Sequence, residues 1–263
     1  MAQDLGIDIG TSNTTVFMKG KGIVLSEPSV VAVNQNTGRP VAVGTAAERM
    51  IGRTPASIKA IRPVRNGTIA DFEAAEFMMN YFLTKVSGLG VRLGSVRMLL
   101  TVPTVISEVE QLAVLEAVKS ACGKTARVKA RLIEVPLASA IGADLPLSVG
   151  SAEGSMIIDV GGGTTEICAF SMGCILKGDS VKVGGEDFST QLVNYVKSEH
   201  NLIIGETSAE EAKKKAGSVF PTDEPRFADI SGRDIITGMP GNVRLNSNEL
   251  VAPLKDPAIK IIA

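Results

Sequence analysis

One short pattern occurs twice in the chain and constrains its fold more than any other feature. The first copy is "IDIGTSNTT" at residues 7–15, and the second is "IDVGGGTTE" at residues 158–166. Each copy reads apolar, Asp, apolar, Gly, then three small residues and a Thr, and each opens a new run of strand-like residues. Such internal similarity predicts two related halves, each starting with a strand–turn–strand hairpin.

The residue types in both turns favour phosphate binding. Glycines let the backbone approach an anion closely, and successive N–H groups of a turn point toward it. The hydroxyl groups of Thr11, Ser12 and Thr164 add further donors. A carboxylate placed just before such a turn would repel phosphate unless a cation lay between them, so we interpret Asp8 and Asp159 as holding Mg²⁺ through its retained waters. Two such hairpins are expected to grip a nucleoside triphosphate from both sides.

An ordinary hairpin turn remains the alternative interpretation of each copy, because Gly-rich turns are common. An aspartate at the same place in both copies favours the phosphate clamp over two unrelated turns. The complete Walker-type loop, in which a glycine precedes a Gly-Lys-Ser/Thr ending at fixed spacing, is absent from the sequence. The sequence therefore excludes the P-loop class of nucleotide-binding proteins.

Composition excludes several other functional classes. Lys plus Arg total 27 against 28 for Asp plus Glu, and the chain has no Trp and two Tyr, so nucleic acid is not expected as a partner. His200 is the only histidine, which leaves almost no material for a histidine zinc site or a Ser-His-Asp triad. Three cysteines without a CxxC pair, with neither a signal peptide nor a long apolar run, predict a cytoplasmic protein.

Strand-like and helix-like segments alternate along the chain, which predicts an α/β architecture. Strands are expected at 4–9, 14–19, 22–33, 96–103 and 128–133, and again from residue 155. Helices are expected at 45–53, 71–86, 107–121, 186–200 and 208–216, with another beginning at Pro136. Asp71 is a candidate N-cap, and Ser107 forms a capping-box pattern with Glu110. Residues 54–71 read as a broken connection, and residues 256–263 as a helix barely begun.

Longer stretches resemble the actin, sugar-kinase and heat-shock chaperone ATPase superfamily, and within it the MreB family of bacterial actin homologues. The stretches that carry this resemblance are "GKGIVLSEPSVVAV", "GRTPASIKAIRPVRNGTIADFE", "SMIIDVGGGTTEI", "LIIGETSAEEAKKKAG" and "GRDIITGMP". The resemblance implies an actin-like ATPase fold of the α/β class, with two lobes, each a mixed sheet flanked by helices, and four subdomains. It also implies ATP and Mg²⁺ in the cleft.

The resemblance also implies where the lobes and subdomains lie. The first lobe is expected at 1–145, with a small inserted subdomain at about 34–70. The second lobe is expected at 146–263, with subdomain IIA at 146–182 and subdomain IIB at about 183–250. A C-terminal part of this second lobe, which the family carries, is expected to be absent.

The resemblance assigns nucleotide contacts residue by residue. In the two hairpins these contacts are Asp8, Gly10, Thr11, Ser12, Asn13, Asp159, Gly161, Gly162, Gly163 and Thr164. On the helix of "SAEEAKKKAG", Glu210, Glu211 and Lys213 match the family's contacts to ribose and adenine. The residues alone favour a solvated helix face with i,i+4 ion pairs as the alternative for these three charges.

One departure from the family pattern concerns hydrolysis. The family carries two acidic residues before the proline of "IEVPLASAIGA", where this chain has Glu134 and Val135. A valine cannot accept a proton or orient water, and Glu134, one residue along a strand end, points elsewhere. Thr164 and, more weakly, Glu134 are the catalytic candidates, and whether ATP is hydrolysed stays open. Asn66 replaces the usual Asp in an equally good turn, so no functional change is expected from it.

The resemblance implies membrane-associated homopolymeric protofilaments that govern cell shape together with proteins of cell-wall elongation. Leu89, Val91 and Leu93 in "SGLGVRLGS" are candidate contacts with the inner face of the cytoplasmic membrane; a plain connecting loop is the alternative. Two other functions share the fold: a monomeric ATP-switched binding or scaffold module, and a small-molecule kinase. The family-specific stretches outside the ATP site favour the filament protein over both.

Overall fold

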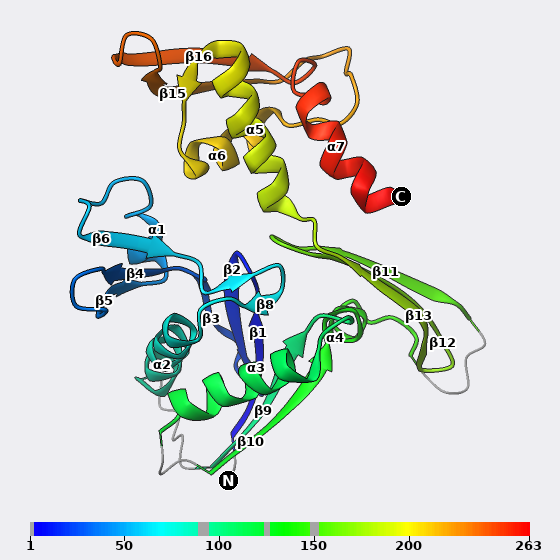
Figure 1. The fold of residues 1–263 in the computed structure, drawn as a ribbon. Helices are drawn as coiled ribbons and strands as arrows, with labels where there is room; N and C mark the ends of the chain where they lie inside the picture. The colour runs from blue at the N-terminus through cyan, green and yellow to red at the C-terminus, as the bar shows by residue number, and fades with distance from the viewer. Residues whose placement is uncertain (1–2, 89–94, 124–126, 148–152) are drawn as a thin grey trace. The chain divides into compact units, whose positions relative to one another are not determined.

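The structure is a computed structural model that describes residues 3–88, 95–123, 127–147 and 153–263. The chain divides into two compact units, Met1–Lys182 and Val183–Ala263. Each unit is described by itself below (Figure 1).

A five-stranded mixed sheet forms the centre of the first unit. Its order is β10 (Arg127–Glu134), β9 (Ser95–Val102), β1 (Gln3–Ile9), β2 (Asn13–Met18) and β3 (Gly22–Pro28). Strand β1 is antiparallel to β2 and parallel to β9. Alternate residues of β1, β2 and β9 are buried, as a sheet with one face on a core requires.

Helices α2 (Phe72–Gly88) and α3 (Glu108–Ala121) supply the other side of this core (Figure 1). Both start at residues that the sequence marks as N-caps. The Asp71 carboxylate accepts the Ala74 N–H at 3.0 Å, and Ser107 forms the full capping box with Glu110. The apolar spacing of the two helices then buries side chains such as Phe82 against the sheet.

A small sheet of β5 (Pro40–Val43), β4 (Val31–Asn34) and β6 (Ile58–Ile61), with the short helix α1 (Thr45–Glu48), follows β3. The prediction of one strand over 22–33 is wrong, because β3 ends at Pro28 and β4 belongs to this other sheet. Ser29 makes the break. Its hydroxyl donates to the Gly10 carbonyl at 2.7 Å and its N–H to the Ser12 carbonyl at 2.9 Å.

The stretch 54–71, expected to be an irregular connection, contains three strands. Besides β6 these are β7 (Val64–Arg65) and β8 (Thr68–Ile69), which pair as a two-stranded hairpin. Prolines and glycines limit each strand to a few residues. Helix α1 is also shorter than the helix predicted at 45–53. It ends at Glu48, and a series of turns follows it.

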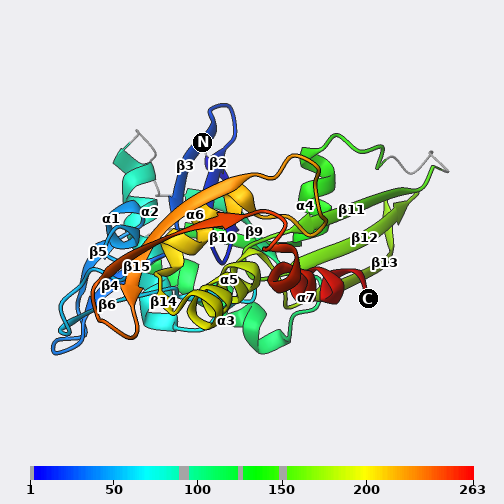
Figure 2. The ribbon, with the colours of Figure 1, turned by 90° about the horizontal axis from the view of Figure 1, so that it is seen from above.

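A second antiparallel sheet in the same unit comprises β11 (Ser155–Val160), β12 (Thr165–Ser171) and β13 (Cys174–Val181). Helix α4 (Val135–Gly142), which follows β10, packs on it through a cluster of Ala140, Cys168 and Phe170. Pro136 lies in the first turn of α4, as the sequence predicts. Figure 2 shows α4 beside the long strands of this sheet.

The second unit packs helices on a three-stranded antiparallel sheet. Its helices are α5 (Gly185–His200), α6 (Glu206–Ala216) and α7 (Val251–Ile262), and its strands are β14 (Leu202–Ile203), β15 (Phe227–Asp234) and β16 (Pro240–Asn246). Residues 256–263 complete α7 rather than beginning a helix. The helix begins before the expected residue 256 because Leu250 and Leu254 are both buried in the core of the unit.

Candidate functional site

The two copies of the sequence repeat form the same turn. In the first hairpin (β1–β2) the Gly10 N–H donates to the Asn13 carbonyl at 3.1 Å. In the second hairpin (β11–β12) the Gly161 N–H donates to the Thr164 carbonyl at 2.8 Å. The strand registers also match, since Asp8 lies opposite Thr15 and Asp159 lies opposite Glu166. The repeat is therefore structural as well as sequential.

The two turns lie against each other in the first unit. A Cβ atom added to Gly163 would lie 2.8 Å from Thr11 Oγ1, and one added to Gly162 would collide with Ser12. A side chain at Gly163 would push the turns apart, and one at Gly162 would displace the Ser12 hydroxyl, because real Cβ atoms do not approach heavy atoms so closely. The structure brings the hydroxyl-bearing turn of the first hairpin to the glycine turn of the second.

The two repeated carboxylates are near enough for their charges to interact. Burial raises the pKa of Asp8 above its usual range, the hydrogen bond from Thr101 lowers it, and the charge of Asp159 raises it further. Asp8 keeps solvent-exposed area although protein atoms crowd around it. Thr101 Oγ1 donates to Asp8 Oδ1, and Ser139 Oγ donates to Asp159 Oδ2, each at 2.6 Å.

A third turn lies beside the two hairpin turns, and its position there was not predicted from the sequence. Asn66 and Gly67 connect β7 to β8, both with positive φ. The Gly67 N–H donates to Thr11 Oγ1 at 3.2 Å, and the Asn66 nitrogen lies 2.9 Å from a Cβ built on Gly163. The Asn-Gly pair signals a turn in the sequence, but nothing in the sequence places that turn beside the hairpins.

Glu166 anchors the second hairpin. Its buried carboxylate accepts the Thr104 N–H at 3.1 Å and the Ser180 hydroxyl at 2.6 Å. Thr104 follows β9 of the five-stranded sheet, so this carboxylate ties β12 to the first half of the unit. Glu166 is the last residue of the second copy of the repeated pattern. Its charge inside a strand is the sequence signal that could have identified it as an anchor.

The N-terminus of α4 carries the two residues singled out for catalysis. Glu134 is the N-cap residue, and its side chain makes no capping hydrogen bond. Val135 is the first residue of the helix and is partly buried. Among these two side chains only Glu134 can accept a proton.

Glu210 and Lys213 lie together in the second unit, on α6 facing the start of α5. The Glu210 carboxylate accepts the Ser189 hydroxyl at 2.7 Å and pairs with Lys213 Nζ at 2.5 Å. Lys213 also donates to the Gly185 carbonyl at 2.7 Å. Burial alone would raise the pKa of Glu210, but Lys213 and Ser189 together lower it. These two charges are therefore internally paired rather than simply solvated.

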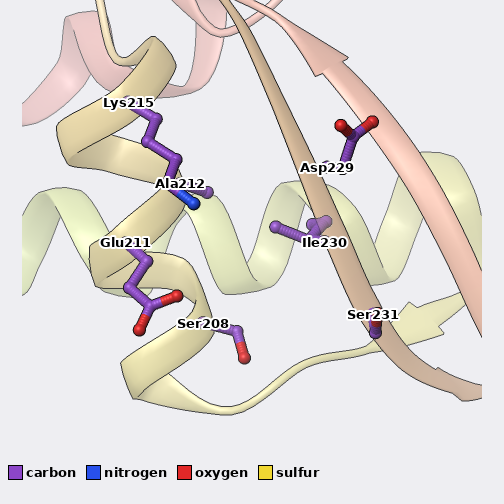
Figure 3. Close-up of a pocket in the computed structure, with 7 residues that line it drawn as sticks. All are labelled: Ser208, Glu211, Ala212, Lys215, Asp229, Ile230 and Ser231. Atoms are coloured by element: carbon purple, nitrogen blue, oxygen red, sulfur yellow. The ribbon is translucent and has the colours of Figure 1, made fainter.

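Two grooves flank α6. Glu211 is separate from the Glu210–Lys213 pair and lines a groove of about 190 Å³ between α6 and β15, shown in Figure 3. This groove is lined by Ser208, Glu211, Ala212, Lys215, Asp229, Ile230 and Ser231. A second groove, of about 370 Å³, is lined by Phe188, Lys213, Gly217, Ser218, Val219 and Leu254. Lys213 thus borders a mostly apolar hollow.

The described residues hold no cluster of three or more His, Cys, Asp or Glu side chains arranged for a metal ion. The Asp8 and Asp159 pair nevertheless fits Mg²⁺, because this ion keeps several waters and takes one or two carboxylates together with phosphate oxygens. No helix in the described parts of the chain is long and apolar enough to cross a membrane. Leu89, Val91 and Leu93 lie outside the described residues.

Comparison with known proteins places the chain in a family. The model of the family described as MreB/Mbl protein matches residues 2–263. The cell shape-determining protein Mbl of Bacillus subtilis (strain 168) is 43% identical over 261 residues, covering 99% of this chain and 76% of that protein. The cell shape-determining protein MreB of Escherichia coli (strain K12) is 44% identical over 266 residues, covering 100% of this chain and 75% of that protein.

Solved structures share the actin-like fold expected from the sequence. MreB5 of Spiroplasma citri bound to ADP has a TM-score of 0.89 and 31% identity, covering 100% of this chain and 77% of that one. Its structure bound to AMPPNP matches equally well. The MamK double helical filament matches with a TM-score of 0.75 at 21% identity, which shows the fold alone. The chain belongs to the MreB/Mbl family of cell shape-determining proteins, a nucleotide-binding family with an actin-like fold.

Proposed function

We propose that this chain binds ATP with Mg²⁺ at the two repeated hairpins and that nucleotide controls its assembly into filaments. The observation that carries the proposal is the meeting of two turns that share one hydrogen-bond pattern, each preceded by an aspartate. The Spiroplasma citri relative was solved with ADP and with AMPPNP, and its likeness over the whole of this chain supports the same ligand class here.

Each hairpin residue has a role in this proposal. Gly10 and Gly161 open the two turns, and their own N–H groups are bonded to the Asn13 and Thr164 carbonyls. The N–H groups of the turn residues that follow would face the phosphates, together with the hydroxyl groups of Thr11, Ser12 and Thr164. Asn13 closes the first turn through its carbonyl. Asp8 and Asp159 hold the waters of Mg²⁺, which when bound neutralises phosphate charge that the carboxylates would otherwise repel. Two carboxylates are sufficient because phosphate oxygens and retained waters would complete the coordination of the ion.

The nucleoside end is proposed to lie on α6. Lys213 borders the groove of about 370 Å³, a volume within the range of small-molecule sites and bordered by apolar side chains that suit a flat base. Glu210 holds Lys213 in place through their ion pair. Glu211 lines the other groove, so its proposed contact with the ribose is supported by the family resemblance and not by the groove that Lys213 borders.

Hydrolysis is proposed to be slow in this chain. Val135 offers no proton acceptor at the position where the family carries its second acid. Thr164 can donate to a phosphate oxygen, and Glu134 is the remaining acid on α4. Nucleotide binding does not depend on a proton acceptor at position 134 or 135.

The cellular role is proposed from the family. Homopolymeric protofilaments at the inner face of the cytoplasmic membrane would guide cell-wall elongation proteins, with Leu89, Val91 and Leu93 as the membrane contact. The names of the Bacillus and Escherichia relatives as cell shape-determining proteins support this role. The two-lobed organisation with its lobe boundary near residue 145, its insertion at about 34–70, and subdomains at 146–182 and 183–250 belongs to the same proposal.

Pelleting and phosphate release measured in one tube test this function. We expect ATP-dependent pelleting of the chain with little phosphate release, and faster release by Val135→Glu. The control is pelleting with Mg²⁺ chelated, which removes the metal that the proposed complex needs. Failure of both proteins to pellet while nucleotide stays bound would contradict the filament proposal and leave a switch-like ATP binder.

A further inference from the structure

Each of the two repeated carboxylates receives one hydroxyl hydrogen bond from outside its own hairpin. Thr101 donates to Asp8 Oδ1 and Ser139 donates to Asp159 Oδ2, both at 2.6 Å. Bonds this short between a hydroxyl and a carboxylate are charge-assisted and restrict the rotation of the carboxylate plane. In both cases one carboxylate oxygen is occupied and the other is left available to a ligand.

The two donors come from different kinds of element. Thr101 lies on β9, the parallel neighbour of β1, and directly follows Leu100, which pairs with Ile7 just before Asp8. Strand β11 has only β12 as a partner within the described sheets. The donor to Asp159 is therefore supplied from helix α4, which belongs to the connection between the two halves of the repeat.

Packing fixes the direction of the Ser139 hydroxyl. The next residue, Ala140, is completely buried with Cys168 and Phe170 of β12. Helix α4 therefore cannot rotate about its axis without breaking this contact, and Ser139 stays directed at β11. The anchoring resembles the outer hydrogen bonds that orient metal-ligating carboxylates.

We infer that Ser139 is a positioning residue of the metal site, which holds the Asp159 carboxylate so that its free oxygen faces the hydrated Mg²⁺. Thr101 does the same for Asp8. Neither hydroxyl touches the nucleotide in this account, and both act through the carboxylates. The inference rests on the proposed function, because it presupposes that Asp8 and Asp159 serve a magnesium–nucleotide complex.

The residue at position 135 bears on the same contact. Val135 and Ser139 are four residues apart on α4, so their side chains share one face of the helix. A valine cannot compete for the Ser139 hydroxyl, whereas a glutamate at 135 would offer a second acceptor. Val135→Glu is therefore expected to weaken the hold of Ser139 on Asp159 while supplying a base.

The test separates metal binding from nucleotide binding. A fluorescent ADP analogue is titrated against the full chain in EDTA, and then Mg²⁺ is titrated at fixed nucleotide. For Ser139→Ala we expect unchanged affinity in EDTA and an increase of about tenfold in the Mg²⁺ concentration at half-saturation. Ser139→Thr keeps a hydroxyl and should return the Mg²⁺ concentration at half-saturation to that of the unmodified chain. Ser87→Ala, which removes a helix hydroxyl bonded to the Leu83 carbonyl, is the matched control.

Each outcome decides one claim. An unchanged Mg²⁺ requirement in Ser139→Ala, with nucleotide still bound, would overturn the inference and leave the proposed function standing. A loss of affinity in EDTA together with a lower melting temperature would overturn it too, because Ser139 would then be structural. No Mg²⁺-dependent binding by the unmodified chain would refute the proposed function itself. Thr101→Val provides a second test. It should raise the Mg²⁺ concentration at half-saturation in the same way, because Thr101 positions Asp8.

Discussion

The first and second hairpins share one turn but differ in what surrounds them. Strand β1 has a hydrogen-bonded neighbour on each side, and its residues Ile7 and Ile9 are buried. Strand β11 pairs with β12 alone among the described strands, and Ile158 and Val160 are more than half exposed. The turn is a local property of the repeated residues, whereas the support of each hairpin depends on contacts far away in sequence.

Because of this difference, the second hairpin depends on polar cross-links in addition to its apolar packing against α4. Glu166 ties β12 to Thr104 of the first half, and Ser139 ties β11 to α4. The first hairpin has a continuous sheet instead. Mutations that are equivalent by register should therefore have unequal effects.

The largest expected effect tests this inequality at matched positions. Glu166→Ala leaves the Thr104 N–H and the Ser180 hydroxyl without their acceptor, and we expect a loss of about 3 kcal/mol in the free energy of unfolding. Thr15→Ala, at the same register position of the first hairpin, removes only a 3.4 Å contact with Ser26, so its effect should stay below about 0.5 kcal/mol. Urea unfolding measures both. Equal losses would show that the two hairpins are supported alike.

The next effect concerns the contact between the two turns. Gly163→Ala places a Cβ atom 2.8 Å from Thr11 Oγ1 and 2.9 Å from the Asn66 nitrogen. We expect a loss of about 2 kcal/mol in stability and weaker nucleotide binding, because the turns must move apart. Gly142→Ala is the control, since nothing lies within 4 Å of its added Cβ. Unchanged binding and stability in Gly163→Ala would contradict the close approach of the turns.

A smaller effect distinguishes Asp8 by its pH dependence. Burial and Asp159 raise the pKa of Asp8 in the folded chain, so the folded state binds more protons than the unfolded state just above pH 3.8. Its contribution to stability is therefore greatest at low pH and is lost as the pH rises through the raised pKa. Without Mg²⁺, Asp8→Asn should melt slightly above the unmodified chain at pH 7, with the advantage fading toward pH 4.

Thermal melts at both pH values, with and without Mg²⁺ and nucleotide, check this prediction. The ligands should reverse the order at pH 7, because the unmodified chain gains a metal partner that the asparagine lacks. An Asp8→Asn protein that is less stable at pH 7 even in EDTA would contradict the idea that the two carboxylates repel each other.

The features that the sequence predicts correctly are those determined by residues close together in the chain. The caps at Asp71 and Ser107 and the two Gly-rich turns all involve residues close in the chain, and all appear where the residues predict them. The break after Pro28 was missed because Ser29 bonds to the first hairpin, a contact across the sheet. The length of helix α7 was underestimated because its first turn is stabilised by burial of Leu250 and Leu254, and no capping residue marks its start in the sequence.

The candidate site divides in the same way. The turns and their aspartates follow from a repeated pattern that can be read in the sequence. Their partners Thr101, Ser139 and the Asn66–Gly67 turn arrive from other elements, and only the fold brings them together. In the sequence Asn66 is a plain turn residue, because nothing local connects it to Thr11.

The most direct test of the central claim compares the two aspartates. Mg²⁺-dependent binding of fluorescent ATP is measured for the unmodified chain, Asp8→Asn and Asp159→Asn, with binding in EDTA as the reference. We expect each substitution to remove most of the Mg²⁺ dependence, because both hairpins serve one metal–nucleotide complex. Full Mg²⁺ dependence in Asp159→Asn would contradict this claim and would reduce the second hairpin to an ordinary turn.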